Sequence, residues 1–145
     1  MRRSPLGRPL VLALVFATGC AGSFNPNRTP AIKGTWTLLA VSPALDASWE
    51  SADQLNVSAS LAVQWHGDSH PSTGHFSLVL HRPTGTVQTS GGWARQDVGG
   101  QPAYWLHPSD GGSGFGCDVS GEYLYLGPYQ VPGYGLGYLW FTRTQ

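Results

Sequence analysis

The sequence is poor in cysteine and in charged side chains, and both shortages narrow what the protein can be. It contains only 2 cysteines, so a framework of several disulfides is excluded. Charged residues make up 11% of the chain, and 8 Lys and Arg are balanced by 8 Asp and Glu. Because no basic patch is available to neutralise phosphates, we expect no binding to nucleic acid.

The chain also lacks a hydrophobic run long enough to cross a membrane as a helix. Its longest apolar run, Leu10–Ala17, covers only 8 residues, whereas a spanning helix needs about 20. Arg2, Arg3 and Arg8 precede this run, and small residues follow it. A basic segment, a short apolar core and a small-residue cleavage site together predict a secretory signal peptide over residues 1–19.

The residues at the end of this segment, Ala17-Thr18-Gly19-Cys20, resemble the lipobox of bacterial lipoproteins. The resemblance implies that Cys20 is acylated, for example with palmitate, and becomes the mature N-terminus. It further implies a lipid-anchored protein of the cell envelope, on the outer membrane facing the periplasm if the envelope has two membranes. The alternative is ordinary secretory cleavage that leaves Cys20 as a free thiol. With Cys20 acylated, Cys117 has no partner for an internal disulfide, and its role stays open.

The remaining chain divides into a short linker and one domain. Residues 20–31 contain Pro, Asn and Ser without periodicity, which predicts a flexible tether between the membrane and the domain. Residues 32–145 are enough for one small domain. From Cys20 onward, 5 basic and 8 acidic side chains leave a net charge of −3.

Alternating side chains predict that this domain consists of β-strands. In Leu55–Trp65, apolar residues occupy every second position and polar residues fill most of the positions between them, as in a strand with one buried face. Only Pro43–Leu55 offers a helix, with a turn or two over Ser48–Gln54. Other expected strands are Thr35–Val41, Phe76–Leu80, Thr86–Gln96, Ala103–His107, Cys117–Glu122, Tyr123–Leu126 and Gly135–Arg143.

Turn-forming residues separate these strands, at Pro83-Thr84-Gly85, Gly99-Gly100, Asp110-Gly111-Gly112 and Pro132-Gly133. Short strands at this spacing favour an all-β fold, either a sandwich or a barrel. We predict a small antiparallel β-barrel of about eight strands, since closure removes exposed strand edges.

The first and last strands resemble those of lipocalins and the wider calycin group. Gly34-Thr35-Trp36 has the Gly-x-Trp that opens the first lipocalin strand, and Arg143 ends the last strand. The resemblance implies a lipocalin-like barrel over Ile32–Gln145, with Arg143 stacked on Trp36 to close one barrel end. Gly121-Glu122-Tyr123, followed by alternating leucines, is similar to bacterial lipocalin-like lipoproteins. Small periplasmic protease-inhibitor barrels share a similar opening strand and are the competing resemblance.

Candidate catalytic and metal-binding motifs are weak. Three histidines and Asp68 gather in His66–His75, and imidazole with carboxylate suits zinc or copper, but the spacing matches no metal motif. Gly67-Asp68-Ser69 resembles an esterase nucleophile block, but no downstream Asp-x-x-His follows. The Gly-rich segment Gly111–Gly116 lacks the Lys of a phosphate loop and is interpreted as a flexible loop. We therefore predict no catalytic residues, no metal and no cofactor, and a protein that is not an enzyme.

Aromatic residues remain as the binding signal, because large rings line apolar pockets while their polar tips meet a ligand. Four of them are expected on inward faces near strand ends as ligand-binding residues: Trp65, Phe76, Trp93 and Trp105. The predicted function is that of a membrane-anchored lipoprotein whose barrel binds a small apolar ligand. The alternative is a protein-interaction module, such as a protease inhibitor or an accessory of envelope assembly.

Overall fold

A computed structural model describes residues 29–43, 48–67, 69–131 and 135–144. Its strands form one antiparallel sheet that closes into a barrel, because the first strand pairs with the last. The sheet order follows the chain, apart from a two-residue strand, β2, which adds to β1. The elements are β1 (Gly34–Pro43), β2 (Glu50–Ser51), α2 (Ala52–Leu55), β3 (Ser58–Trp65), β4 (Thr73–Arg82), β5 (Gly85–Val98), β6 (Gln101–Pro108), β7 (Phe115–Ser120), β8 (Tyr123–Val131) and β9 (Gly135–Arg143).

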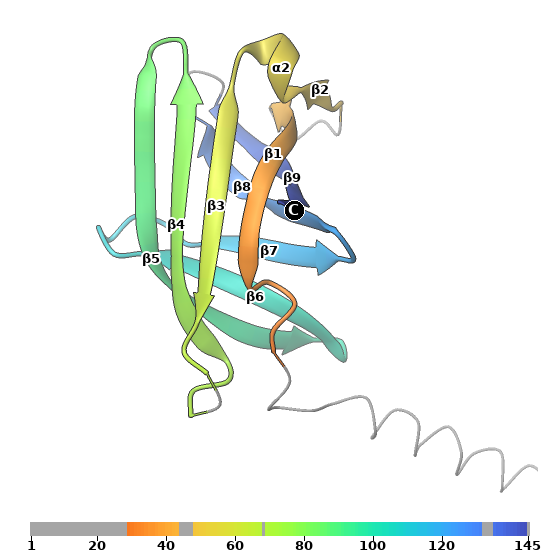
Figure 1. Ribbon diagram of the computed structural model, residues 1–145, viewed down its shortest axis with the longest axis vertical. Helices are drawn as coiled ribbons and strands as arrows, with labels where there is room; N and C mark the ends of the chain where they lie inside the picture. The colour runs from red at the N-terminus through yellow and green to blue at the C-terminus, as the bar shows by residue number, and fades with distance from the viewer. Residues whose placement is uncertain (1–28, 44–47, 68, 132–134, 145) are drawn as a thin grey trace, which may run out of the picture.

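This architecture confirms the predicted fold class, an all-β antiparallel barrel of eight strands with β2 as a short addition. Figure 1 shows β1, β3 and β4 standing side by side at the front, while β7 crosses behind them. Each of β3 to β9 pairs with the strand before it in the sequence, except that β3 pairs with β1 because β2 and α2 intervene. Neighbouring strands are therefore joined by short connections, which suit antiparallel pairing.

The alternation seen in the sequence places the apolar side chains inside the barrel. In β3, Ala59, Leu61 and Val63 are buried, while the residues between them are exposed or half-buried. The same rule holds in β4, where Phe76, Leu78 and Leu80 are buried. Because the side-chain period of a strand is two, each barrel strand contributes one face to the core and one to the outside.

The segment before β3 differs from the expected continuous strand. Leu55 ends the single-turn helix α2, and Asn56 follows in the left-handed conformation with φ 56°. The backbone N–H of Val57 then bonds to the carbonyl of Ala52 at 3.0 Å. The strand predicted from Leu55 therefore begins only at Ser58, because Asn56 tolerates the left-handed turn that ends the helix.

Strand β7 begins earlier than the sequence indicated. Phe115 is buried in the core and pairs with Leu106 of β6, so the expected Gly-rich loop ends at Gly114. Gly121 and Glu122 form the turn to β8, although Glu122 was expected to be the last strand residue. The turns at Gly99-Gly100 and Asp110-Gly111 are confirmed, whereas Pro132-Gly133 lies outside the described residues.

The predicted signal peptide, Cys20 and most of the tether also lie outside the described residues. The described chain starts with a segment that packs against the barrel: Pro30 is buried, and Ile32 is fully buried in the core. The last residues of the expected tether thus belong to the folded domain. Within the ranges that the structure describes, no helix is both long and apolar enough to span a membrane.

Candidate functional site

Large side chains fill the interior of the barrel. Trp36, Trp93 and Phe141 are fully buried or nearly so, together with leucines from several strands. Ring contacts hold this core together: Phe76 meets Phe115 edge-on, with centroids 5.8 Å apart, and Trp93 meets Tyr104 at 5.7 Å. An eight-stranded barrel either is filled by its own side chains or holds one small ligand, and the large buried side chains here favour the filled arrangement.

The four aromatic residues predicted to bind a ligand do not surround one common pocket. Phe76 and Trp93 are only 3% and 2% exposed and belong to the packed core. The Trp93 Nε1–H donates to the carbonyl of Gln64 at 2.8 Å, which satisfies its polar atom without a ligand. Trp65 is half-buried at the end of β3, where its Nε1–H donates to the carbonyl of Pro71 at 3.1 Å.

The expectation that Trp105 faces the interior is wrong. Its neighbours Tyr104 and Leu106 are buried, while Trp105 itself is 37% exposed on the outer face of β6. Whether a side chain of β6 points into the barrel or outward depends on the register of the alternation, because adjacent strand positions point to opposite sides of the sheet. In Ala103–His107, the presence of three large side chains in a row hid which of them point inward.

Trp36 and Arg143 lie together at one end of the barrel. They are paired across β1 and β9, and the Arg143 guanidinium lies 4.1 Å from the centre of the Trp36 ring. Arg143 also donates to the carbonyls of Lys33 and Ala31, at 2.8 and 2.9 Å. The Trp36 Nε1–H donates to the carbonyl of Ile32 at 2.9 Å. The N-terminal segment, the ring and the guanidinium thereby close this end.

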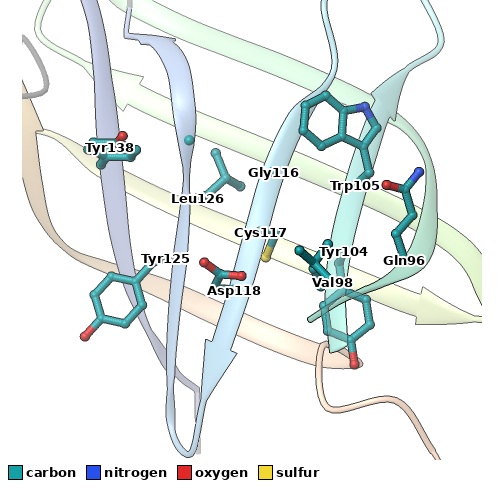
Figure 2. A pocket seen from close by; sticks show the side chains of 12 residues that line it. Gln96, Val98, Tyr104, Trp105, Gly116, Cys117, Asp118, Tyr125, Leu126 and Tyr138 are labelled. Atoms are coloured by element: carbon teal, nitrogen blue, oxygen red, sulfur yellow. The ribbon is translucent and has the colours of Figure 1, made fainter. Parts of the chain in front are cut away.

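A groove with a volume of about 290 Å³ lies on the outside of the barrel, over β5 to β9. Figure 2 shows Trp105 and Tyr138 on opposite sides of Gly116, with Asp118 further along β7. The groove exists because β7 and β8 place glycines, Gly116 and Gly127, opposite each other in the register. Its lining consists of Gln96, Val98, Ala103, Tyr104, Trp105, Gly116, Cys117, Asp118, Tyr125, Leu126, Gly127 and Tyr138.

The rings of Trp105 and Tyr138 lean over these glycines from two sides. A Cβ atom at Gly116 would lie 3.5 Å from Cζ3 of Trp105, and one at Gly127 would lie 2.5 Å from Cδ1 of Tyr138. Since Gly116 and Gly127 are direct neighbours across the strands, the two rings border the same strip of the sheet from opposite sides. Both rings remain more than a third exposed, so each presents part of its surface to solvent.

Two titratable groups form the inner wall of the groove. Burial raises the pKa of the Cys117 thiol, and the nearby carboxylate of Asp118 raises it further. Burial also raises the pKa of Tyr104, although the positive charge of Arg95 opposes this shift. A thiol whose pKa is raised stays protonated and is a poor nucleophile. The groove therefore offers surfaces for binding, and Cys117 lacks the thiolate character needed for nucleophilic chemistry.

A second groove, of about 680 Å³, is lined by His66 and His70 of the β3–β4 connection and by His75 of β4. The rings of His66 and His75 are 4.6 Å apart, and His107 of β6 lies on the same groove. The Nδ1 atom of His66 is hydrogen-bonded to the Thr73 hydroxyl at 3.1 Å. Among the described residues, no group of three or more His, Cys, Asp or Glu side chains is placed to hold a metal ion, and Asp68 lies outside them.

Sequence reasoning missed the outer groove and the role of Tyr138 and Asp118 in it. The feature that could have predicted the groove is the pairing of glycines with aromatic residues on adjacent strands. This pairing can be recognised only when the strand register is known, because the register places Trp105 beside Gly116, and Gly116 beside Gly127.

No family model matches the chain, and no curated protein matches it. Among solved structures, a similar one is the siderocalin Ex-FABP, described as functioning through dual ligand specificities. It has a TM-score of 0.49 and 11% sequence identity, over 79% of this chain and 75% of that chain.

Proposed function

We propose that the protein is a lipid-anchored, non-enzymatic barrel that binds a small ligand in the groove on its outer face. The supporting observation is the contrast between a filled interior and a concave outer groove with two exposed aromatic rings. Its volume, about 290 Å³, is close to the lower limit of about 300 Å³ for ligand pockets. The sequence predicted a small apolar ligand inside the barrel, whereas the site proposed here lies on the outside of the barrel.

The binding proposal is tested by filling the groove. Gly116→Leu places a side chain between Trp105 and Tyr138, at a position where a Cβ meets only ordinary contacts. Gly92→Leu is the matched control, because Gly92 lies on the outer face of β5 and its Cβ would also be in ordinary contact. Native mass spectrometry of the full chain released from its own membrane is expected to show a bound small molecule in the parent and in Gly92→Leu, and none in Gly116→Leu. Equal occupancy in all three proteins, or in none, would contradict the proposal.

The membrane anchor is tested separately at Cys20, since the lipobox resemblance alone supports it. A single acyl chain binds membranes weakly, so stable attachment needs more than one chain. We expect the parent to incorporate labelled palmitate and to enter the detergent phase, while Cys20→Ser does neither. Detergent partitioning of Cys20→Ser like that of the parent would contradict the anchor.

A protein-interaction role is the second candidate, and a cluster of aromatic rings beside the groove favours it. Trp49 and Tyr123 are 38% and 43% exposed, and both pack against Trp140 with ring centroids 5.5 and 5.6 Å away. Exposed Trp and Tyr are typical of protein interfaces. If the cluster binds a partner, Trp49→Ser weakens cross-linking to that partner while Gly116→Leu leaves it unchanged. The opposite pattern would contradict this second role.

A further inference from the structure

The charge in the outer groove indicates what kind of ligand it takes. Asp118 is exposed, and it is the sole charged side chain among the residues that line the groove. Arg95, the basic residue of β5, is not among the lining residues and forms an ion pair with Asp97 at 3.0 Å. The groove therefore presents a negative charge with no cation in its lining, which disfavours anions and favours a positively charged ligand.

The rings beside Asp118 favour the same sign of charge. Figure 2 shows the Trp105 ring face-on, whereas the Tyr138 ring stands nearly edge-on to the viewer. The two rings therefore differ in orientation, and both keep part of their surface exposed to solvent. The face of an aromatic ring carries negative potential and attracts cations, with Trp the strongest of the three aromatic residues.

The shape of the groove separates an organic cation from a metal ion. Asp118 supplies one carboxylate, and the lining contains no further Asp, Glu or His, whereas calcium needs six to eight oxygen ligands and zinc about four ligands. A quaternary ammonium group instead needs ring faces and one negative charge at van der Waals distance, because it has no hydrogen-bond donors. Trp105 and Tyr138, on either side of the paired glycines Gly116 and Gly127, offer the ring surfaces, and Asp118 of the same groove offers the charge.

We propose that this groove binds a small organic cation of the quaternary ammonium type, held between Trp105 and Tyr138 and neutralised by Asp118. This inference rests on the proposed function, since it names the ligand class of the same groove. The groove leaves room beyond the ammonium group for a short tail, which Gln96 and Tyr104 border.

The charge is tested with a pair of probes that have the same shape. Choline carries a trimethylammonium group, and 3,3-dimethyl-1-butanol carries a neutral tert-butyl group in its place. We expect choline to quench tryptophan fluorescence saturably in the full chain and to bind about tenfold more tightly than the neutral probe, as a cation–π contact of about 1–2 kcal/mol implies. Choline binding should also weaken as salt is added, because Asp118 is exposed to solvent.

Two variants test whether the preference for choline over the neutral probe depends on Asp118. Asp118→Asn keeps the shape of the side chain and is expected to weaken choline binding about twofold to fivefold while leaving the neutral probe unchanged. Asp53→Asn in α2 removes the same charge far from the groove and should leave both affinities unchanged. If both probes bind with equal affinity, the charge inference is wrong while the binding groove stands. If neither binds, the charge inference is overturned, and the mass spectrometry of Gly116→Leu decides independently whether the groove binds anything.

A last comparison separates a free cation from a lipid headgroup, since phosphatidylcholine carries the same trimethylammonium group. Choline and vesicles of phosphatidylcholine are offered to Cys20→Ser, which lacks its own proposed anchor, with phosphatidylglycerol vesicles as the control. Binding of choline without binding of either vesicle supports a free ligand. Selective binding of phosphatidylcholine vesicles, lost in Asp118→Asn, supports the headgroup as source, and equal binding of both vesicles contradicts recognition of the cation.

Discussion

Aromatic rings of this barrel lie over glycines of neighbouring strands, both inside and outside. Trp93 covers Gly74 in the core, while Trp105 and Tyr138 cover Gly116 and Gly127 on the surface. A glycine in a strand leaves backbone exposed and loses more conformational entropy on folding than other residues. A ring from the adjacent strand covers that backbone and restores the packing contacts that the glycine lacks. The missing side chain of each glycine therefore leaves room for one specific ring.

The core pair predicts a large effect of one added methyl group. In Gly74→Ala the new Cβ would overlap the carbonyl oxygen of Gln64 and the indole of Trp93. Trp93 is held by its hydrogen bond to that same carbonyl, so neither group can move away freely. We expect a loss of about 3 kcal/mol in the free energy of unfolding, at the upper end of the usual cost of overpacking. Urea unfolding followed by circular dichroism measures it.

Gly92→Ala is the matched control for this prediction. Gly92 lies on the adjacent strand β5, and an added Cβ would be 3.5 Å from the carbonyl of Gly74, an ordinary contact. Its stability should stay within about 0.5 kcal/mol of the parent. A similar loss in both variants would mean that glycine flexibility, rather than the space under Trp93, matters at these sites.

At the scale of elements, β1 and β9 carry the closure of the barrel. They pair from Trp36 with Arg143 to Pro43 with Gly137, with one irregularity between Leu38 and Ala40. The two strands are separated by nearly the whole chain, so their pairing orders a long loop. Arg143 links this β1–β9 seam, the pairing that closes the barrel, to the N-terminal segment by donating hydrogen bonds to the carbonyls of Lys33 and Ala31.

We expect Arg143→Ala to lower the free energy of unfolding by about 2–3 kcal/mol. The substitution removes the contact with the Trp36 ring and leaves two carbonyl groups without their charged donor. Glu122→Gln is the control, because it removes only the exposed ion pair with Arg143 at 3.6 Å and should cost less than about 0.5 kcal/mol. Chemical unfolding of the parent and of both variants measures these losses in the free energy of unfolding. A loss in Glu122→Gln as large as that in Arg143→Ala would show that the ion pair, and not the ring contact, holds the seam.

The strands were predictable from the sequence because their alternation is local, but their ends were not. Leu61 and Phe76 could be assigned to the core from period two alone. The start of β3 depends on Asn56, whose left-handed conformation closes α2, and the start of β7 depends on burial of Phe115. The pairing of Trp36 with Arg143 came from the lipocalin resemblance, since no local pattern links residues so far apart.

At the scale of the whole molecule, the balance between interior and surface could not be predicted. The sequence shows how many rings exist, but only the register shows that Trp93 points inward and Trp105 outward. In this barrel the bulky side chains of Trp36, Trp93 and Phe141 are buried in the core, which reduces the interior space open to a ligand. The proposed binding site therefore lies on the outside, where Gly116 and Gly127 leave room between two rings.

The filled interior also predicts how the stability of the whole molecule changes at alkaline pH. Burial raises the pKa of the Cys117 thiol above its ordinary value of 9.0, so the folded state keeps a proton that the unfolded state loses above pH 9. The stabilisation is fully present below pH 9 and falls as pH rises, by up to about 1.4 kcal/mol per pH unit for one group. In Cys117→Ala the free energy of unfolding should be lower at pH 7, since buried volume is lost, but should fall less steeply between pH 9 and 10.

The measurement is urea unfolding across pH 7–10, and the pH 7–8 range, where the thiol stays protonated in both states, serves as the internal control. Curves that remain parallel up to pH 10 would mean that the thiol ionises as readily in the folded barrel as in the unfolded chain.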